Sequence, residues 1–121
     1  MRRVEARNAA RGTVLGERIG VADRWWLRLR GLLGTLPLQA GAGLLIEPCH
    51  AVHMAGMRYP IDVAFLAADG AVVATYASLP PGARTRWHRA ARRALELPAG
   101  TLAATGTVEG DLILCTAQES M

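Results

Sequence analysis

The sequence predicts an α+β domain that is rich in β-strands, and three observations support this prediction. Short apolar runs alternate with polar residues in steps of two and are separated by Gly, Pro and Asp-Gly turns. Only one segment, at about residues 22–33, has apolar side chains at helical spacing. The 121 residues, half apolar and one in five charged, match a globular chain forming a single domain over residues 1–121.

The N-terminal third is predicted to contain two short strands followed by the helix. The first twenty residues carry isolated apolar positions between three glycines, which is typical of strands and turns. The helix at about 22–33 would be capped by Asp23 and would end between Gly31 and Gly34, because Pro37 cannot continue it. Its two tryptophans fall on the broad apolar face, so we interpret them as core residues.

The rest of the chain is predicted to be mostly strands. The apolar run at residues 44–46 is predicted as a strand that is broken by Pro48, and Asp69-Gly70 is a hairpin signal between strands at 61–66 and 71–76. The segment up to Arg93 that follows Pro80-Pro81-Gly82 is predicted either as an exposed loop or as a short helix. Further short strands are expected at 94–97 and 112–115, with a helical turn after Gly100.

The charge of the chain gives little support to a nucleic-acid partner. All fourteen basic residues are Arg, which we interpret as codon bias, although Arg is also the better bidentate ligand for phosphate. The net charge of +4 is modest, the Arg residues are spread along the chain, and no recognition motif is present. One basic cluster surrounds Trp87 and His88 and fits either a phosphate and base site or a solvated face: Arg84, Arg86, Arg89, Arg92 and Arg93.

The sequence contains no segment that targets the chain to a membrane. No apolar run approaches the roughly 20 residues that span a bilayer. The first residues lack the apolar core of a signal peptide, so we expect a cytoplasmic protein. In that reducing compartment Cys49 and Cys115 are expected to be free thiols.

Several sequence blocks occur in an order that resembles a known family. They are Arg30-Gly31-Leu32-Leu33-Gly34, Gly41 to Ile46, Pro60-Ile61-Asp62, Asp69-Gly70, Leu95 to Gly100 and Gly110-Asp111. On these blocks the chain resembles the family called domain of unknown function 192 (DUF192) over nearly its whole length. The resemblance implies a compact β-sandwich or barrel-like domain with short helices, and it implies no reaction.

The central block resembles one branch of that family, which has a His-x-x-Gly-Met-Arg-aromatic-Pro-Ile-Asp pattern. Many other relatives have Trp-Met-Lys-Asn-Thr at this place. The chain departs from its own branch at Ala55, where an aromatic is expected, and at Met54, where a hydroxyl is expected. A site that used either group would be weakened here.

The same block contains a candidate acid and base pair. If the chain turns at Ala55-Gly56, His53 would lie opposite Asp62, and the carboxylate would fix the tautomer of the imidazole. Such a pair could orient a ligand or transfer a proton. The structural interpretation is a hydrogen bond that satisfies a buried carboxylate.

The block also contains side chains that bind soft metals, namely Cys49, His50, His53, Met54 and Met57. On an extended strand, however, Cys49 and His53 lie about 13 Å apart, because each residue advances the chain by about 3.3 Å. Ligands of one ion must lie much closer to each other. We therefore predict no metal and no cofactor, and keep Cu(I) or Zn binding as an alternative.

These observations predict a protein of uncharacterised function that binds a small ligand or a protein partner. Its expected pocket is formed by His53, Arg58 and Asp62, with Met57 and Cys49 beside them. Arg58 could hold an anionic group through paired hydrogen bonds. The alternative from another class is a hydrolase or other enzyme that uses His53 and Asp62, either with or without Cys49 as a nucleophile.

Overall fold

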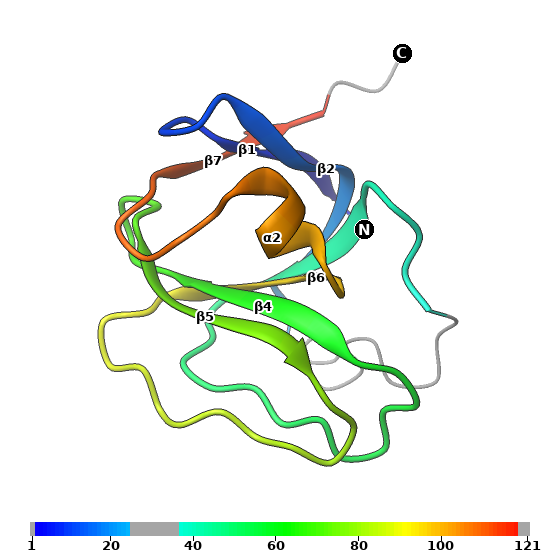
Figure 1. Cartoon of the computed structure of the whole chain (residues 1–121). Coiled ribbons are helices and arrows are strands. Elements are labelled where there is room, and N and C mark those ends of the chain that lie inside the picture. Colours follow the sequence, from blue (N-terminus) through cyan, green and yellow to red (C-terminus); the bar gives the residue numbers. More distant parts are fainter. Residues whose placement is uncertain (1, 25–36, 119–121) are drawn as a thin grey trace.

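The computed structural model describes residues 2–24 and 37–118, which form one curled β-sheet and a short helix (Figure 1). The strands are β1 (Arg3–Asn8), β2 (Thr13–Ala22), β3 (Ala42–Ile46), β4 (Ile61–Leu66), β5 (Val72–Leu79), β6 (Arg93–Pro98) and β7 (Ile113–Ala117), and the helix is α2 (Thr101–Thr105). The β-rich α+β class is confirmed. The helix predicted at about 22–33 falls mostly on residues 25–36, which lie outside the described residues, and its first residue, Ala22, ends β2.

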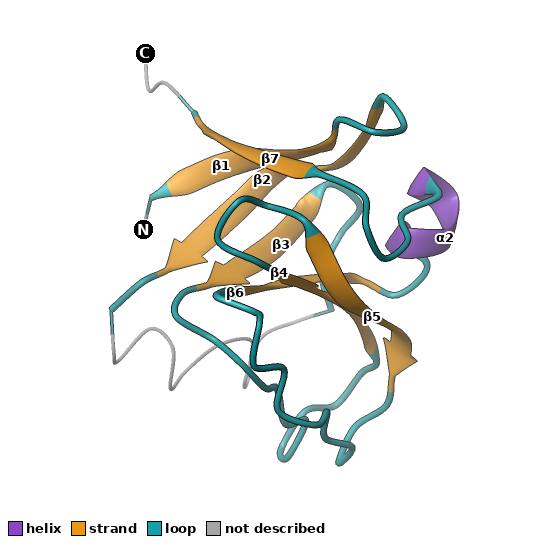
Figure 2. Ribbon diagram, turned by 90° about the vertical axis from the view of Figure 1, so that its left-hand side faces the viewer, coloured by secondary structure: helices purple, strands orange, loops and turns teal. Residues whose placement is uncertain are grey.

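The seven strands follow the order β5-β4-β6-β3-β2-β1-β7, and only the β2–β3 pair is parallel. The sheet curls so that its two edges approach each other (Figure 2). Ala71 and Leu112 form an isolated bridge between these edges. Beside it, the Val72 amide donates to the Asp111 carbonyl at 2.8 Å and the Ile113 amide donates to the Gly70 carbonyl at 2.9 Å. The result is a half-barrel, which corresponds to the barrel-like form of the two that the resemblance implied, a β-sandwich or a barrel-like domain.

Both faces of the sheet are buried at β4 and β6, whereas β1 and β7 expose one face. Side chains alternate along a strand, so Leu95 and Leu97 of β6 lie on the inner face, while Ala94 and Glu96 lie on the outer face. All six residues of β4 are buried, which requires a cover on each side of that strand. The inner core consists mainly of Val4, Leu15, Ile19, Val21, Leu45, Leu66, Leu95, Leu97 and Ile113. The outer core contains Leu44, Ile46, Ile61, Val63, Phe65, Val52, Met54 and Ala91.

Two long connections, residues 47–60 and 80–92, contribute to the outer core and lie side by side in the lower part of Figures 1 and 2. Their backbones are hydrogen-bonded to each other. The Met54 amide donates to the Ala83 carbonyl at 2.7 Å, and the Thr85 amide donates to the Val52 carbonyl at 2.9 Å. Residues 80–92 are therefore a loop, which settles the choice between loop and helix left open by the sequence.

The predicted hairpin between β4 and β5 is confirmed. Asp69 Oδ1 accepts a hydrogen bond from the Ala71 amide at 2.9 Å. Gly70 has φ +94°, a left-handed conformation that favours glycine. The turn thus uses the local chemistry for which Asp-Gly is suited.

Among residues 2–24 and 37–118, no helix is both long and apolar enough to cross a membrane.

Candidate functional site

Asp62 is fully buried on the inner face of β4, and its carboxylate serves the fold. It accepts hydrogen bonds from the backbone amides of Ser78 at 2.8 Å, Gly100 at 3.1 Å and Leu102 at 2.8 Å. Gly100 is the N-cap of α2 and has no side chain to accept from the helix. Asp62 therefore replaces the missing cap from a neighbouring strand and ties α2 and β5 to β4.

His53 lies elsewhere, on the exposed side of the loop before β4. Its backbone forms an isolated bridge with Arg84. In the described part of the chain, no hydrogen bond joins its imidazole to Asp62, both of whose oxygens accept from backbone amides. Asp62 is thus a buried carboxylate that is satisfied by hydrogen bonds, as in the structural interpretation of the sequence, but its donors are backbone amides and not the imidazole of His53.

The other residues of the predicted pocket are distributed along the same loop. The Cys49 thiol donates to the Ala51 carbonyl at 3.2 Å, and Met57 packs against the outer core. Arg58 is exposed. Within the described ranges, no three His, Cys, Asp or Glu side chains come together in a way that could hold a metal ion.

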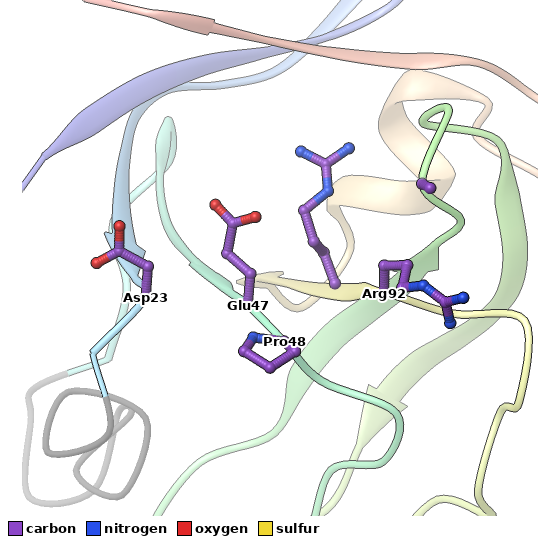
Figure 3. A pocket seen from close by; sticks show the side chains of 6 residues that line it. Asp23, Glu47, Pro48 and Arg92 are labelled. Carbon is purple, nitrogen blue, oxygen red and sulfur yellow. The ribbon is translucent and has the colours of Figure 1, made fainter.

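A pocket of about 590 Å³ opens at one mouth of the half-barrel. In Figure 3, Asp23 and Arg92 lie on opposite sides of Glu47 and Pro48. These residues meet because β2 and β3 run parallel and end at the same edge, whereas β6 runs antiparallel to β3 and begins there. The lining residues are Asp23, Glu47, Pro48, Ala68, Arg92 and Arg93.

The acidic and the basic residues that line this mouth do not form ion pairs with each other. The Arg2 guanidinium lies 3.4 Å from the carboxylate of Asp23 and 3.2 Å from that of Glu47, so the two acids are bridged by a cation. In contrast, no carboxylate of the described residues lies within 4.0 Å of the guanidinium of Arg92 or Arg93. Arg92 Nη1 donates to the Ala91 carbonyl at 3.4 Å, and the Arg93 side chain forms a hydrogen bond with Cys115. The remaining donors of the two guanidinium groups are available to an anion.

Cys115 on β7 lies near the same mouth, on the inner face. Burial raises the pKa of its thiol, and the Glu47 carboxylate adds to the rise, while the Arg93 guanidinium opposes both. The thiol therefore stays protonated at neutral pH, which argues against a nucleophilic role.

A second cluster lies where the two loops pair. The rings of His50 and Trp87 stack with centroids 4.6 Å apart and planes 19° apart. Below them, His88 is buried, and its Nε2 lies 2.6 Å from the Tyr76 hydroxyl. Burial lowers the pKa of His88, Arg86 lowers it further, and Glu109 opposes them, so the ring is neutral at neutral pH. This arrangement fixes an aromatic pair, of which Trp87 remains 67% exposed.

A buried carboxyl group, Glu96, lies on the outer face between Leu44 and Val63, its neighbours across β3 and β4. Its residue is only 5% exposed. Among the residues that the structure describes, no cationic side chain lies within 4.0 Å of this carboxyl. Burial raises its pKa from 4.5 to about 7.

The sequence did not identify the pocket or the stacked pair. Asp23 and Glu47 each follow a strand directly, and this change from apolar to charged was the available signal. Arg92 and Arg93 were assigned to the basic cluster around Trp87, but not to a pocket. The pairing of His50 with Trp87 depends on loop register, which has no local signal.

Comparison with known proteins gives a family and a fold. The model of the DUF192 family, described as an uncharacterized ACR, matches residues 6–115. No curated protein matches the chain.

Two solved structures are similar to it. A "putative transcription regulator" from Sinorhizobium meliloti 1021 has a TM-score of 0.78 at 23% identity, with 94% of this chain and 92% of that chain covered. A protein of unknown function from Novosphingobium aromaticivorans DSM 12444 has a TM-score of 0.78 at 21% identity, with 93% and 83% covered. The family model covers most of the sequence, and the chain therefore belongs to the DUF192 family.

Proposed function

We propose that this protein binds a small anionic ligand at the mouth of the half-barrel. The observation that carries the proposal is the pair Arg92 and Arg93, which line the pocket and have no carboxylate within 4.0 Å among the described residues. A guanidinium offers a rigid fork of donors that matches a carboxylate or phosphate. A volume of about 590 Å³ is in the usual range for a small-molecule site.

The charges around the mouth favour an anion over a cation. Arg2 bridges Asp23 and Glu47, so a cationic ligand would have to compete with a side chain of the protein itself. An anion would meet Arg92 and Arg93 without displacing a carboxylate of the described residues. The ligand class is therefore a small carboxylate or phosphate ester.

This proposal keeps the ligand binding predicted from the sequence, but it places the ligand beside Arg92 and Arg93 instead of beside His53, Arg58 and Asp62. The Cys49 amide donates to the Arg92 carbonyl at 3.0 Å, so the loop that contains the predicted site begins beside the pocket. Contacts from His53, Arg58 and Met57 remain predictions. The assignment to the His-x-x-Gly-Met-Arg branch, the single domain over residues 1–121 and the cytoplasmic location are likewise proposals.

The enzyme alternative has less support. Both oxygens of Asp62 accept from backbone amides, so this residue would have to break structural bonds to act as a base. The Cys49 thiol donates to the Ala51 carbonyl of its own loop, whereas a nucleophilic thiol has to give its proton to a base.

The proposal is tested by ligand-induced stabilisation. Native mass spectra, recorded beside the denatured mass, would first show whether a small molecule copurifies. Thermal denaturation is then followed in increasing inorganic phosphate and in increasing citrate, because a ligand that binds the folded state raises the melting temperature. We expect Arg92→Ala/Arg93→Ala to weaken binding of the stabilising anion at least about tenfold.

The matched control is Arg84→Ala/Arg86→Ala on the loop 80–92, which removes the same charge from two exposed side chains that do not line the pocket. It should retain the shift seen with the wild type. Equal shifts in the wild type and in Arg92→Ala/Arg93→Ala, or no shift with either anion, would contradict the proposal.

A further inference from the structure

The loops formed by residues 47–60 and 80–92 make a surface of unusual charge. Glu47, which lines the mouth pocket, is the one Asp or Glu in these two stretches, although the chain has ten acidic residues. The two stretches carry five of the fourteen Arg residues and all three His residues. Four of these five Arg residues lie within residues 84–92, and hydrogen bonds hold this stretch beside the one that carries His50 and His53.

The Arg side chains of this surface are available to a partner. Arg84, Arg86 and Arg89 are exposed, and none forms an ion pair with a carboxylate of the described residues. Glu109 acts on the neighbouring His88 through its charge but forms no ion pair with these Arg residues. The local field is consequently positive.

An exposed aromatic platform lies among these cations. Trp87 is 67% exposed and stacks on His50. The backbone of His88 fixes the platform, because its amide donates to the His50 carbonyl at 2.8 Å and its carbonyl lies 3.3 Å from His50 Nδ1. A single exposed tryptophan needs no special explanation. One that is stacked, held by its neighbours and flanked by unpaired Arg residues has the features that bind a base and its phosphates.

We infer that this surface, formed by His50, Arg84, Arg86, Trp87 and Arg89, binds single-stranded nucleic acid. An unpaired base exposes its π-face to Trp87, whereas bases in a duplex are stacked on one another. The flanking phosphates would then contact the guanidinium groups. This site differs from the mouth pocket, which uses Arg92 and Arg93.

The inference is tested with a fluorescein-labelled oligothymidine of about 12 nucleotides, a length that covers typical single-strand sites. Fluorescence anisotropy measures its affinity for the full chain at several salt concentrations. We expect binding that weakens as salt rises, and weaker binding to a duplex of the same length. Equal or tighter binding to the duplex, or no binding to the oligothymidine at low salt, would overturn the inference.

Two variants separate stacking from charge. Trp87→Ala should weaken binding about tenfold or more, because each stacked base contributes strongly to affinity. Arg86→Glu/Arg89→Glu should abolish binding, since it removes two cations and adds two anions. In Arg86→Gln/Arg89→Gln, which retains measurable affinity, the slope of log affinity against log salt should be smaller by roughly 1.4.

The control for net charge is Arg3→Glu/Arg7→Glu on β1, which lies at the far end of the molecule from the loops (Figures 1 and 2). Circular dichroism confirms the fold of each variant. An equal loss in this control and in Arg86→Glu/Arg89→Glu would mean that net charge alone drives binding, and unchanged affinity in Trp87→Ala would exclude stacking. Either result would overturn the inference.

Because Arg92→Ala/Arg93→Ala tests the mouth pocket and Trp87→Ala tests this surface, the two proposals can fail independently.

Discussion

Glu96 shows how one residue makes the stability of this fold depend on pH. Its carboxyl lies on the outer face of β6 between apolar neighbours, and burial raises its pKa from 4.5 to about 7. The folded protein thus retains a proton on Glu96 at pH values where the unfolded chain has lost it. Stability from this group is fully present below pH 4.5 and declines as the pH rises through about 7.

The prediction at this scale is that Glu96→Gln removes that decline. The wild type should lose on the order of 3 kcal/mol of unfolding free energy across the window, whereas the neutral variant should not. Urea denaturation at a series of pH values measures this difference. The exposed Glu17→Gln should behave like the wild type, and an unchanged pH profile in Glu96→Gln would show that the carboxyl ionises freely in the folded state.

Residue chemistry explains why the partner of Asp62 could not be predicted. A carboxylate followed by a strand pattern indicates burial, and burial requires hydrogen-bond donors. The sequence offered His53 as a visible donor, but the structure supplies the backbone amides of Ser78, Gly100 and Leu102. Every residue except Pro carries such an amide, so no side-chain pattern reveals which ones converge.

At the scale of elements, α2 illustrates how a short helix depends on its neighbours. Its five residues are too few to be stable alone, and its N-cap, Gly100, contributes no side-chain hydrogen bond. Asp62 provides the capping acceptor from β4. The helix is thus stabilised by a tertiary contact rather than by its own sequence.

Asp62→Ala should therefore lower the free energy of unfolding by roughly 1 to 3 kcal/mol, because buried amides lose their acceptor. Hydrogen exchange should become faster at the amides of Gly100 and Leu102. His53→Ala, which changes an exposed side chain, should leave both measurements close to those of the wild type. Equal destabilisation by the two variants would indicate that they do act as a pair.

The elements themselves were largely predictable where their signals are local. The β4–β5 hairpin follows from Asp69-Gly70, and β3 and β6 follow from short apolar runs beside turn residues. Pro80-Pro81-Gly82 marks the start of the loop 80–92, but the pairing of this loop has no local signal, because its hydrogen-bond partners lie about thirty residues earlier in the chain. That distance concealed the stacked pair formed by His50 and Trp87.

At the scale of the whole molecule, closure of the half-barrel depends on Gly70. A Cβ built on this residue would contact the carbonyl oxygen of Ile113, the strand residue whose amide donates to Gly70. Gly82 has a similar φ of +82° against +94° for Gly70, but its Cβ would meet no atom within 4 Å. A substitution at either glycine causes backbone strain, but only a substitution at Gly70 also disturbs the contact between the two closing edges.

Gly70→Ala should be destabilised more than Gly82→Ala, which pays only the conformational cost of about 1 kcal/mol. Thermal denaturation gives the difference, and faster amide exchange at Val72 and Ile113 would locate it at the closing edge. If the two variants lose the same free energy of unfolding, the close approach of Gly70 to Ile113 does not contribute to stability and the prediction is wrong.

The mouth pocket could not be predicted because it arises from the strand order. Asp23, Glu47 and Arg92 lie far apart in the sequence, and they meet only because β2, β3 and β6 are neighbours. No periodicity specifies that β2 and β3 run parallel. The family resemblance provided the barrel-like shape, whereas the charges at its mouth are specific to these residues.

The pairing of β1 with β7 has a consequence for the order in which the protein folds. Val4 lies opposite Ala117, and Asn8 lies opposite Ile113, so β1 receives its second neighbour from the other end of the described chain. During synthesis, β1 and β2 can form a hairpin early, but Val4 and Ala6 cannot be covered by β7 until β7 has emerged from the ribosome. Completion of the inner core thus waits for a strand made about a hundred residues later, and until then the free edge of β1 is open to pairing with another chain.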